Sequence, residues 1–238
     1  MNKNTHVKNT PKKWSFIRLK EVAKIRSNKK VKGTNIVAVI PMELVPDSGI
    51  FTKYKVVPIE QVKSSTYCEV GDILLAKITP SLENGKQGIV PFDVPNGFAL
   101  ATTEVFPIAP EEDKIDRFFL FYLLKFDKFR QKIIASMTGT TGRQRASKKA
   151  VENLLIPLPP LPEQKKIAEI LRTVDEAIER TERLKKGLMQ RLLTKDIKHE
   201  RFKKTELGEI PEEWRVVRLG EIAELKSGGT PSRKKPEY

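Results

Sequence analysis

The chain has 238 residues, of which 39% are hydrophobic and 32% charged, and its formal net charge is +15. These proportions are typical of a folded protein with a modest core, and no apolar run approaches the roughly 18 residues of a membrane span. Cys68 is the only cysteine, which excludes an internal disulfide, and His6 and His199 are the only histidines, so we expect no metal site. The N-terminus has no secretory signal, and we expect a cytoplasmic protein without membrane contact.

The positive charge is concentrated at the start of the chain. Residues 1–32 carry eleven Lys or Arg against a single acid, Glu21. Apolar residues such as Trp14 and Leu19 alternate with these charges, which favours a folded element over a solvated tail. Basic surfaces attract phosphate by releasing counterions, so nucleic acid is the favoured partner. The candidate DNA-binding residues here are Lys29, Lys30 and Lys32.

The first two-thirds of the chain predict a mixed α/β domain. Residues 14–26 predict a short strand followed by a short helix. Short strands separated by prolines and turns are then expected at residues 35–40, 53–57, 72–78, 88–92 and 103–108. From residue 115 to residue 135 apolar and aromatic residues recur every three or four positions, which predicts a helix whose aromatic stripe lies in the core.

Two polar loops are candidates for contact with DNA. The first, residues 77–87, offers amides and lysines that suit adenine and guanine edges. Its candidate residues are Lys77, Thr79, Ser81, Asn84, Lys86 and Gln87. The second, residues 136–145, combines two glycines with hydroxyls and arginines that suit phosphate, but it lacks the spacing of a Walker loop. Its candidate residues are Thr140, Thr141, Arg143, Gln144 and Arg145. Ordinary turn chemistry is the alternative interpretation of both loops.

A proline-rich segment then leads into a long helix. Residues 156–162 predict a stiff, extended connector, and a helix of about thirty residues, some 45 Å long, is expected from Pro162 onward. Its apolar residues follow an imperfect heptad: Ile167, Ile170, Leu171, Val174, Ile178, Leu184, Leu188 and Leu192. We expect this face to stand out from its domain and to pair with another long helix, with a helix folded back on its own domain as the alternative.

The passage that begins at Pro11 occurs a second time from Pro211. Pro, Trp, Arg, Leu, Glu and Ala recur at the same offset, and the positions between them mostly hold similar residues. The period of 200 residues is far longer than that of a solenoid repeat, which indicates duplication of a whole domain. The expected organisation is a domain at residues 1–157, connector and helix at 158–196, a linker at 197–210, and the start of a second domain at 211–238.

These motifs together resemble the DNA specificity subunits of type I restriction–modification systems. The resemblance is carried by the Pro-x-x-Trp starts at Pro11 and Pro211, by residues 140–145, and by residues 159–168 (Pro-Pro-Leu-Pro-Glu-Gln-Lys-Lys-Ile-Ala) before the helix. It implies a non-catalytic subunit in which an α/β domain reads half of a bipartite site in double-stranded DNA. It also implies methyltransferase and restriction subunits as partners. S-adenosylmethionine is then expected in the methyltransferase, with no cofactor in this chain.

The sequence departs from the family pattern in its second domain, which begins at Pro211 and spans 28 residues. One explanation is a half-subunit that forms a homodimer through its long helix and reads a symmetric, interrupted site. A shortened or frameshifted chain is the other explanation. A stand-alone basic DNA-binding regulator, or an enzyme with an unrecognised site, are the competing classes of function.

Overall fold

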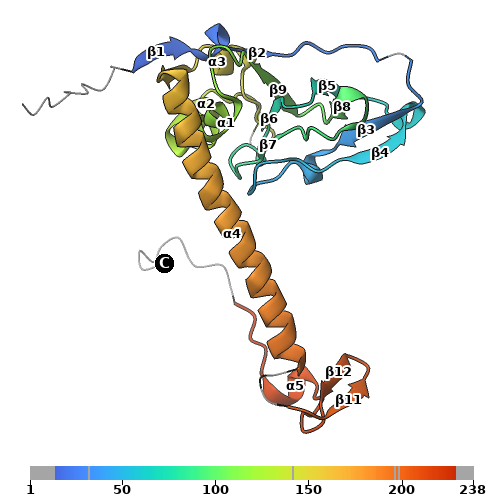
Figure 1. Ribbon diagram of the computed structural model, residues 1–238. Coiled ribbons are helices and arrows are strands. Elements are labelled where there is room, and N and C mark those ends of the chain that lie inside the picture. The colour runs from blue at the N-terminus through green and yellow to red at the C-terminus, as the bar shows by residue number, and fades with distance from the viewer. Residues whose placement is uncertain (1–13, 32, 141, 196, 198, 229–238) are drawn as a thin grey trace, which may run out of the picture. The chain divides into compact units, whose positions relative to one another are not determined.

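The computed structural model describes residues 14–31, 33–140, 142–195, 197 and 199–228 (Figure 1). It divides into two units, residues 1–179 and 180–238, which we describe separately. Two candidate DNA-binding residues, Lys32 and Thr141, lie outside the described residues.

The first unit is a mixed α/β domain, as the sequence predicts. Its strands are β1 (Ser15–Arg18), β2 (Ala23–Ile25), β3 (Ile36–Ile40), β4 (Lys55–Pro58), β5 (Thr66–Glu69), β6 (Ile73–Ala76), β7 (Gln87–Ile89), β8 (Phe98–Ala101), β9 (Val105–Pro110) and β10 (Leu155–Leu158). Its helices are α1 (Arg117–Lys125), α2 (Asp127–Ile134), α3 (Lys148–Glu152) and the first part of α4 (Leu161–Lys195), with short 3-10 turns at Leu19–Glu21, Met42–Leu44, Ile59–Gln61 and Pro95–Gly97.

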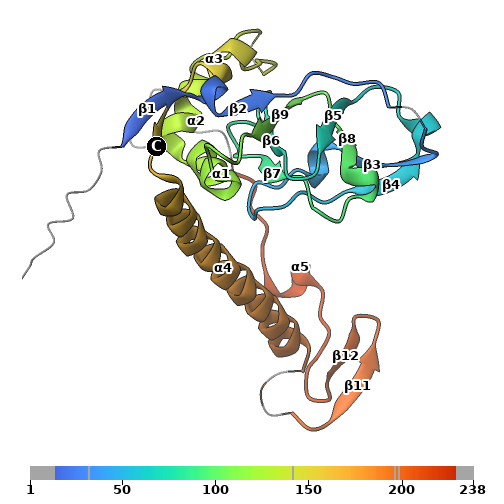
Figure 2. The same ribbon diagram turned by 45° about the horizontal axis from the view of Figure 1, so that its top comes forward.

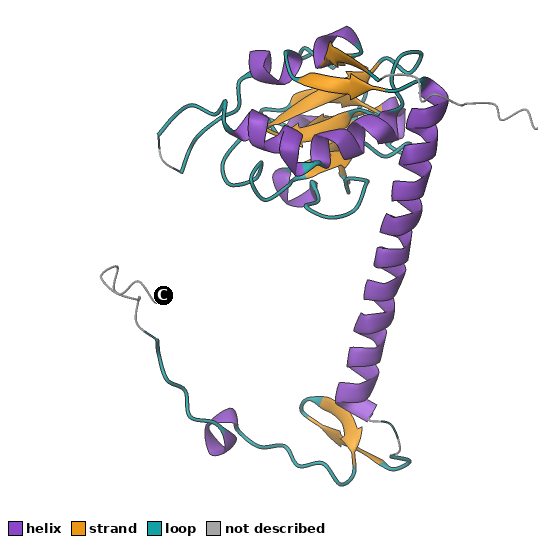
Figure 3. Ribbon diagram, turned by 90° about the vertical axis from the view of Figure 1, so that its left-hand side faces the viewer, coloured by secondary structure: helices purple, strands orange, loops and turns teal. Residues whose placement is uncertain are grey.

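Two four-stranded sheets form the body of this domain (Figure 3). One is antiparallel, with the order β2-β9-β6-β7, and the other has the order β4-β3-β8-β5 with β3 and β8 parallel. Strand β6 lies within the first sheet and is buried along its whole length. Because successive side chains of a strand point to opposite faces, Ile73 and Leu75 enter one core cluster while Leu74 enters the other.

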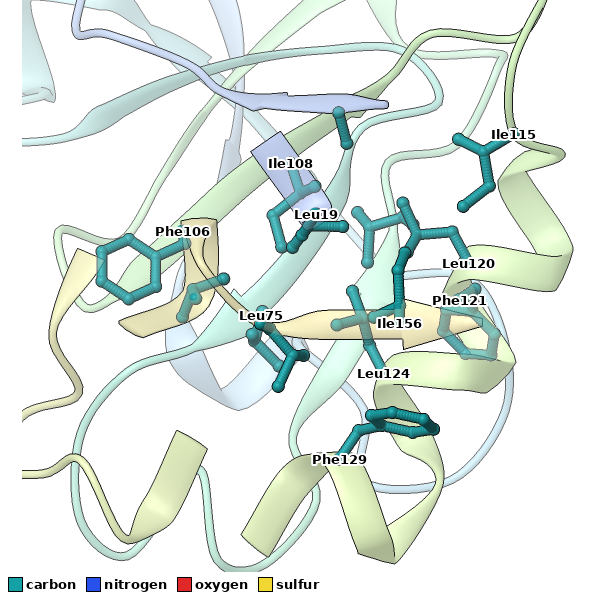
Figure 4. Close-up of a cluster of buried hydrophobic side chains, with 14 of the residues drawn as sticks. Leu19, Leu75, Phe106, Ile108, Ile115, Leu120, Phe121, Leu124, Phe129 and Ile156 are labelled. Atoms are coloured by element: carbon teal, nitrogen blue, oxygen red, sulfur yellow. The ribbon is translucent and has the colours of Figure 1, made fainter. Parts of the chain in front are cut away.

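The larger core joins the first sheet to helices α1 and α2 (Figure 4). The side chains labelled there are Leu19, Leu75, Phe106, Ile108, Ile115, Leu120, Phe121, Leu124, Phe129 and Ile156. Burying each such side chain contributes roughly 1.5–3 kcal/mol. The aromatic stripe predicted for residues 115–135 is therefore largely core, although Phe126 is 56% exposed.

The single helix predicted for residues 115–135 is two helices. Phe126 adopts extended torsions (φ −66°, ψ 126°) between α1 and α2, which breaks the hydrogen-bond ladder. Asp127 then opens α2, where a carboxylate suits the N-terminal dipole. The carboxylate of Asp116 caps α1 by accepting the N–H of Phe119 at 2.9 Å.

The proline-rich segment is in part a strand rather than a free connector. Residues 155–158 form β10, which pairs antiparallel with β1, so that the first and last strands of the domain lie side by side (Figure 1). Pro157 is tolerated because each strand of this two-stranded ribbon is an edge. Helix α4 starts three residues after β10 and has 35 residues, a length of about 52 Å.

The first turns of α4 pack against the domain, whereas most of the apolar residues farther along the helix are exposed, as the sequence predicts. Gln164 is fully buried: its side-chain oxygen accepts the N–H of Asp116 at 2.8 Å, and its amide donates to the carbonyl of Pro159 at 2.8 Å. Helix α1 lies beside the first part of α4 (Figure 2). The hydroxyl of Tyr122 in α1 donates to Asp175 in α4 at 2.8 Å. The Pro-Leu-Pro-Glu-Gln motif thus fastens the helix to α1.

The second unit contains a β-hairpin where a polar linker was predicted. Strands β11 (Phe202–Thr205) and β12 (Gly208–Pro211) pair antiparallel, and a short helix α5 spans Leu219–Ile222. The sequence repeat is also a repeat of local conformation: Arg18 (φ −80°, ψ 141°) and Arg218 (φ −78°, ψ 142°) both precede a single helical turn. Among the described residues, no helix is long and apolar enough to span a membrane.

Candidate nucleic-acid interface

The two polar loops predicted to contact DNA lie against each other. The N–H of Thr79 donates to the carbonyl of Gln144 at 3.1 Å, and the N–H of Ala146 donates to that of Lys77 at 2.7 Å. Ile78 and Arg145 form an antiparallel bridge between these bonds. Residues from distant parts of the sequence therefore form one surface, which sequence reasoning treated as two.

This surface contains a pocket of about 380 Å³ lined by Ile78, Thr79, Gly142, Arg143 and Arg145. Arg145 is held by Glu104, with Nη2 at 2.6 Å from one carboxylate oxygen and Nε at 3.2 Å from the other. The hydrogen bond and charge of Glu104 raise the pKa of Arg145. Lys77 lies beside this pair with its Nζ 5.2 Å from the centre of the Phe106 ring, and partial burial lowers its pKa. The pocket thus presents fixed positive charge and hydroxyl groups.

The floor of the first loop is a buried hydrogen-bond network. Gln87 is fully buried: its amide donates to the carbonyl of Phe121 at 2.8 Å and its oxygen accepts from Arg130 at 3.3 Å. Arg130 also donates to the carbonyl of Leu82 at 3.4 Å. The prediction that Gln87 reads a base is therefore wrong, because its side chain points into the core.

Two other predicted residues of this loop also hold its shape. Ser81 is buried, which contradicts its predicted contact with DNA. The ammonium group of Lys86 donates to the carbonyls of Met42 at 3.1 Å and Val45 at 2.8 Å, so most of its donors are committed. Asn84 stays exposed at the loop tip, and the hydroxyl of Thr79 donates to Glu83 at 2.8 Å. Of the second loop, Thr140 and Arg143 are exposed and Gln144 is half-buried.

A second, basic hollow lies over the β4-β3-β8-β5 sheet. Two adjoining pockets of about 510 Å³ and 430 Å³ share the residues Val62, Ser64, Ser65, Leu100 and Thr103. The larger is also lined by the predicted residues Lys29 and Lys30 and by Lys63, while Glu43 lines the smaller.

The segment that carries these lysines is fastened to strand β5. The amide of Asn28 donates to the carbonyl of Ser65 at 3.0 Å, and its oxygen accepts the N–H of Tyr67 at 3.0 Å. Lys29 Nζ lies 5.3 Å from the centre of the Tyr67 ring. Sequence reasoning missed Lys63, Ser64, Ser65 and Thr103 because it did not predict β5; the Lys-Ser-Ser run ahead of an apolar stretch was the available signal.

The basic hollow and the Arg145 pocket meet at one turn. Thr103 lines the hollow, and the next residue, Glu104, holds Arg145. The carbonyl of Glu104 accepts the N–H of Lys77 at 3.0 Å, which fixes the turn against the first loop. The two regions are therefore joined through residues 103 and 104, and each carries cationic side chains that suit nucleic acid.

The predicted helix interface is exposed apart from its first residue. Ile167 packs partly against the core, whereas Ile170, Leu171, Val174, Ile178, Leu184, Leu188 and Leu192 are between 38% and 63% exposed. At the start of the helix this face borders a largely apolar hollow of about 590 Å³ whose lining includes Trp14, Phe16, Phe126 and Leu171. Exposed apolar surface of this extent marks an interaction site.

Comparison with known proteins identifies the family of this chain. Residues 11–190 match the model of the type I restriction modification DNA specificity domain. A putative type I restriction enzyme MjaX specificity subunit from Methanocaldococcus jannaschii is 33% identical over 237 residues, which cover 92% of this chain and 54% of that protein. The EcoAI specificity subunit from Escherichia coli is 31% identical over 218 residues, which cover 89% of this chain and 35% of that protein. The chain thus spans about half the length of these relatives, or less.

Solved structures share the fold. The HsdS subunit from Thermoanaerobacter tengcongensis superposes with a TM-score of 0.57 at 24% identity, covering 93% of this chain and 57% of that one. A chain from a structural study of type I R-M system assembly gives a TM-score of 0.61 at 24% identity, covering 94% and 58%. On the family match over three-quarters of its length, this chain belongs to the type I restriction modification DNA specificity family.

Proposed function

We propose that this chain reads double-stranded DNA as the non-catalytic specificity component of a type I restriction–modification complex. The observation that carries the proposal is the joining of two distant polar loops into one cationic surface within a domain of this family. In that role it directs methyltransferase and restriction subunits to their site in cytoplasmic DNA. S-adenosylmethionine is then bound by the methyltransferase.

The two regions of the surface suit different parts of DNA. Phosphate contacts position a protein, whereas contacts to base edges give sequence specificity. Lys29, Lys30 and Lys63 surround an open hollow floored by strand residues, which fits a phosphate backbone. The Arg145 pocket, built from two loops, fits a base edge in the major groove.

The exposed face of α4 fits a second long helix, and we propose that a second copy of this chain supplies it in an antiparallel pair. Residues 161–179 carry five acids and three bases, whereas residues 180–195 carry six bases and one acid. An antiparallel pair brings each acidic half against a basic half, while a parallel pair brings like charges together.

Reconstituted methylation tests the proposed function. A methyltransferase subunit from a type I system is incubated with labelled S-adenosylmethionine and DNA, with and without this chain. We expect methyl transfer that requires both proteins and occurs at a defined sequence, and no transfer by this chain alone. Transfer that does not depend on this chain contradicts the proposal. Binding without any effect on methylation favours a stand-alone regulator.

A further inference from the structure

We infer that Arg145 reads the major-groove edge of a guanine and that Glu104 positions it for this contact. The inference rests on the proposed DNA-reading function and deepens it by assigning one side chain to one base. Its basis is the direction in which Glu104 holds the guanidinium of Arg145.

The guanidinium of Arg145 has one edge occupied and one edge open. Its Nε and Nη2 donate to the two oxygens of Glu104 at 3.2 Å and 2.6 Å, so the carboxylate takes the side edge of the fork. The end edge of the guanidinium, formed by Nη1 and the second hydrogen of Nη2, remains open to a ligand. The side chain is 63% exposed. Two parallel donors on such an edge match O6 and N7 of guanine, the commonest specific contact of arginine in DNA.

Both members of the pair are fixed by backbone hydrogen bonds. The N–H and carbonyl of Arg145 exchange bonds with Thr138 at 2.9 Å and 3.0 Å. The N–H of Glu104 donates to the hydroxyl of Thr102 at 3.3 Å, and its carbonyl accepts from Lys77 at 3.0 Å. A long side chain that is already held in one orientation loses less conformational entropy when it binds DNA. This favours a contact with one particular base.

Arg143 provides the contrast on the same loop. It is exposed, lines the same pocket, and has no ion-pair partner among the described residues. An exposed arginine that no carboxylate orients suits phosphate, where charge matters more than direction. The isolated pair of Arg145 and Glu104 adds little to stability because both groups are near solvent, so its bidentate geometry is better explained by orientation of the arginine.

The test replaces single atoms in the DNA, so it does not depend on how variants of the protein fold. The recognised sequence is first defined by methylation with the partner methyltransferase. Each guanine of that site is then replaced by 7-deazaguanine, which lacks the N7 acceptor, and binding of the complex is measured by fluorescence anisotropy. We expect one guanine whose replacement weakens binding about 5- to 150-fold.

Variants assign that guanine to Arg145. With Arg145→Ala, which removes the guanidinium donors, natural and 7-deaza DNA should bind with equal affinity at that position. Glu104→Gln should reduce the difference in affinity between natural and 7-deaza DNA while leaving the salt dependence of binding unchanged. Arg143→Ala is the matched control. It should weaken binding to both DNAs alike and reduce the slope of log affinity against log salt concentration by about one.

The outcomes separate this inference from the function on which it rests. If the complex recognises a defined sequence but no 7-deazaguanine position is sensitive, or if Arg145→Ala preserves the sensitivity, the inference is overturned and the proposed function stands. A recognised site that contains no guanine would likewise overturn the inference and leave the proposed function standing. A uniform loss of affinity across all sequences in Arg145→Ala assigns the residue to phosphate instead and overturns the inference. Absence of any sequence-specific methylation overturns the proposed function.

Discussion

Gln87 and Asn84 belong to one polar loop and have opposite surroundings. Asn84 is exposed at the tip, while Gln87 begins β7 and is fully buried against Phe121 and Arg130. Both have the chemistry to read adenine, so residue type alone does not separate them. The difference arises from a strand that turns the side chain inward, and from α1, which supplies a carbonyl to meet it.

Replacing Gln87 should destabilise the domain rather than alter DNA selectivity. Gln87→Leu removes the hydrogen bonds of its side chain to the carbonyl of Phe121 and to Nη2 of Arg130, at a cost of about 1–3 kcal/mol for each buried group left unsatisfied. Urea unfolding followed by circular dichroism measures the change. Asn84→Ala is the control and should change the free energy of unfolding by less than about 0.5 kcal/mol. Unchanged stability together with a selective loss of one DNA sequence would contradict this assignment.

Cys68 provides a second prediction at the scale of single residues. Burial between β8 and the core raises the pKa of its thiol to about 12. The thiolate is the reactive form, so the native thiol stays protonated at the pH values where an unfolded cysteine begins to ionise. At pH 8 we expect alkylation at least about 100-fold slower in native protein than in urea, because reaction requires opening of the domain.

A cysteine at an exposed serine is the matched control for this measurement. Ser27→Cys in a Cys68→Ser background should react at nearly the same rate in native and unfolded protein. Fast alkylation of native Cys68, with the circular dichroism spectrum unchanged, would show that β5 and β8 are more loosely packed than described here.

At the scale of elements, hydrophobic periodicity predicted the helices and strands whose pattern does not depend on a partner distant in the sequence. The buried runs of β3 and β6 and the heptad of α4 are visible in the sequence because each follows a single, regular pattern. The mixed α/β class followed from them. The repeated Pro-x-x-Trp passage was interpreted as duplication of a domain, and its two copies share their backbone conformation at Arg18 and Arg218.

The elements that were missed depend on a partner distant in the sequence. Residues 155–158 contain a proline and resemble a connector, yet they pair with β1 at the other end of the domain. Strand β5 gains its hydrogen bonds from β8, which also pairs with β3 far away in the sequence. The candidate site shows the same limit: each loop was predicted, but their contact through Thr79 and Gln144 is a tertiary hydrogen bond. Local pattern carries no information about such pairs.

At the scale of the whole molecule, the exposed face of α4 predicts association. The wild-type protein should have about twice its chain mass of 27.1 kDa in light scattering. Leu188→Ser removes an apolar side chain from this face and should shift the equilibrium toward monomer. Gln190→Ser places the same residue on the opposite side of the helix and should leave the mass unchanged. A protein that is monomeric at every concentration would contradict helix pairing between two copies.

The proposed function requires both this association and the polar surface, because a specificity component must bring DNA to the partner that catalyses methyl transfer. Single-molecule methylome sequencing of cells that express this chain beside a type I methyltransferase tests it most directly. We expect N6-methyladenine at one defined motif, and we expect this methylation to disappear when this chain is omitted. Methylation that is absent, or whose motif is the same without this chain, would contradict it.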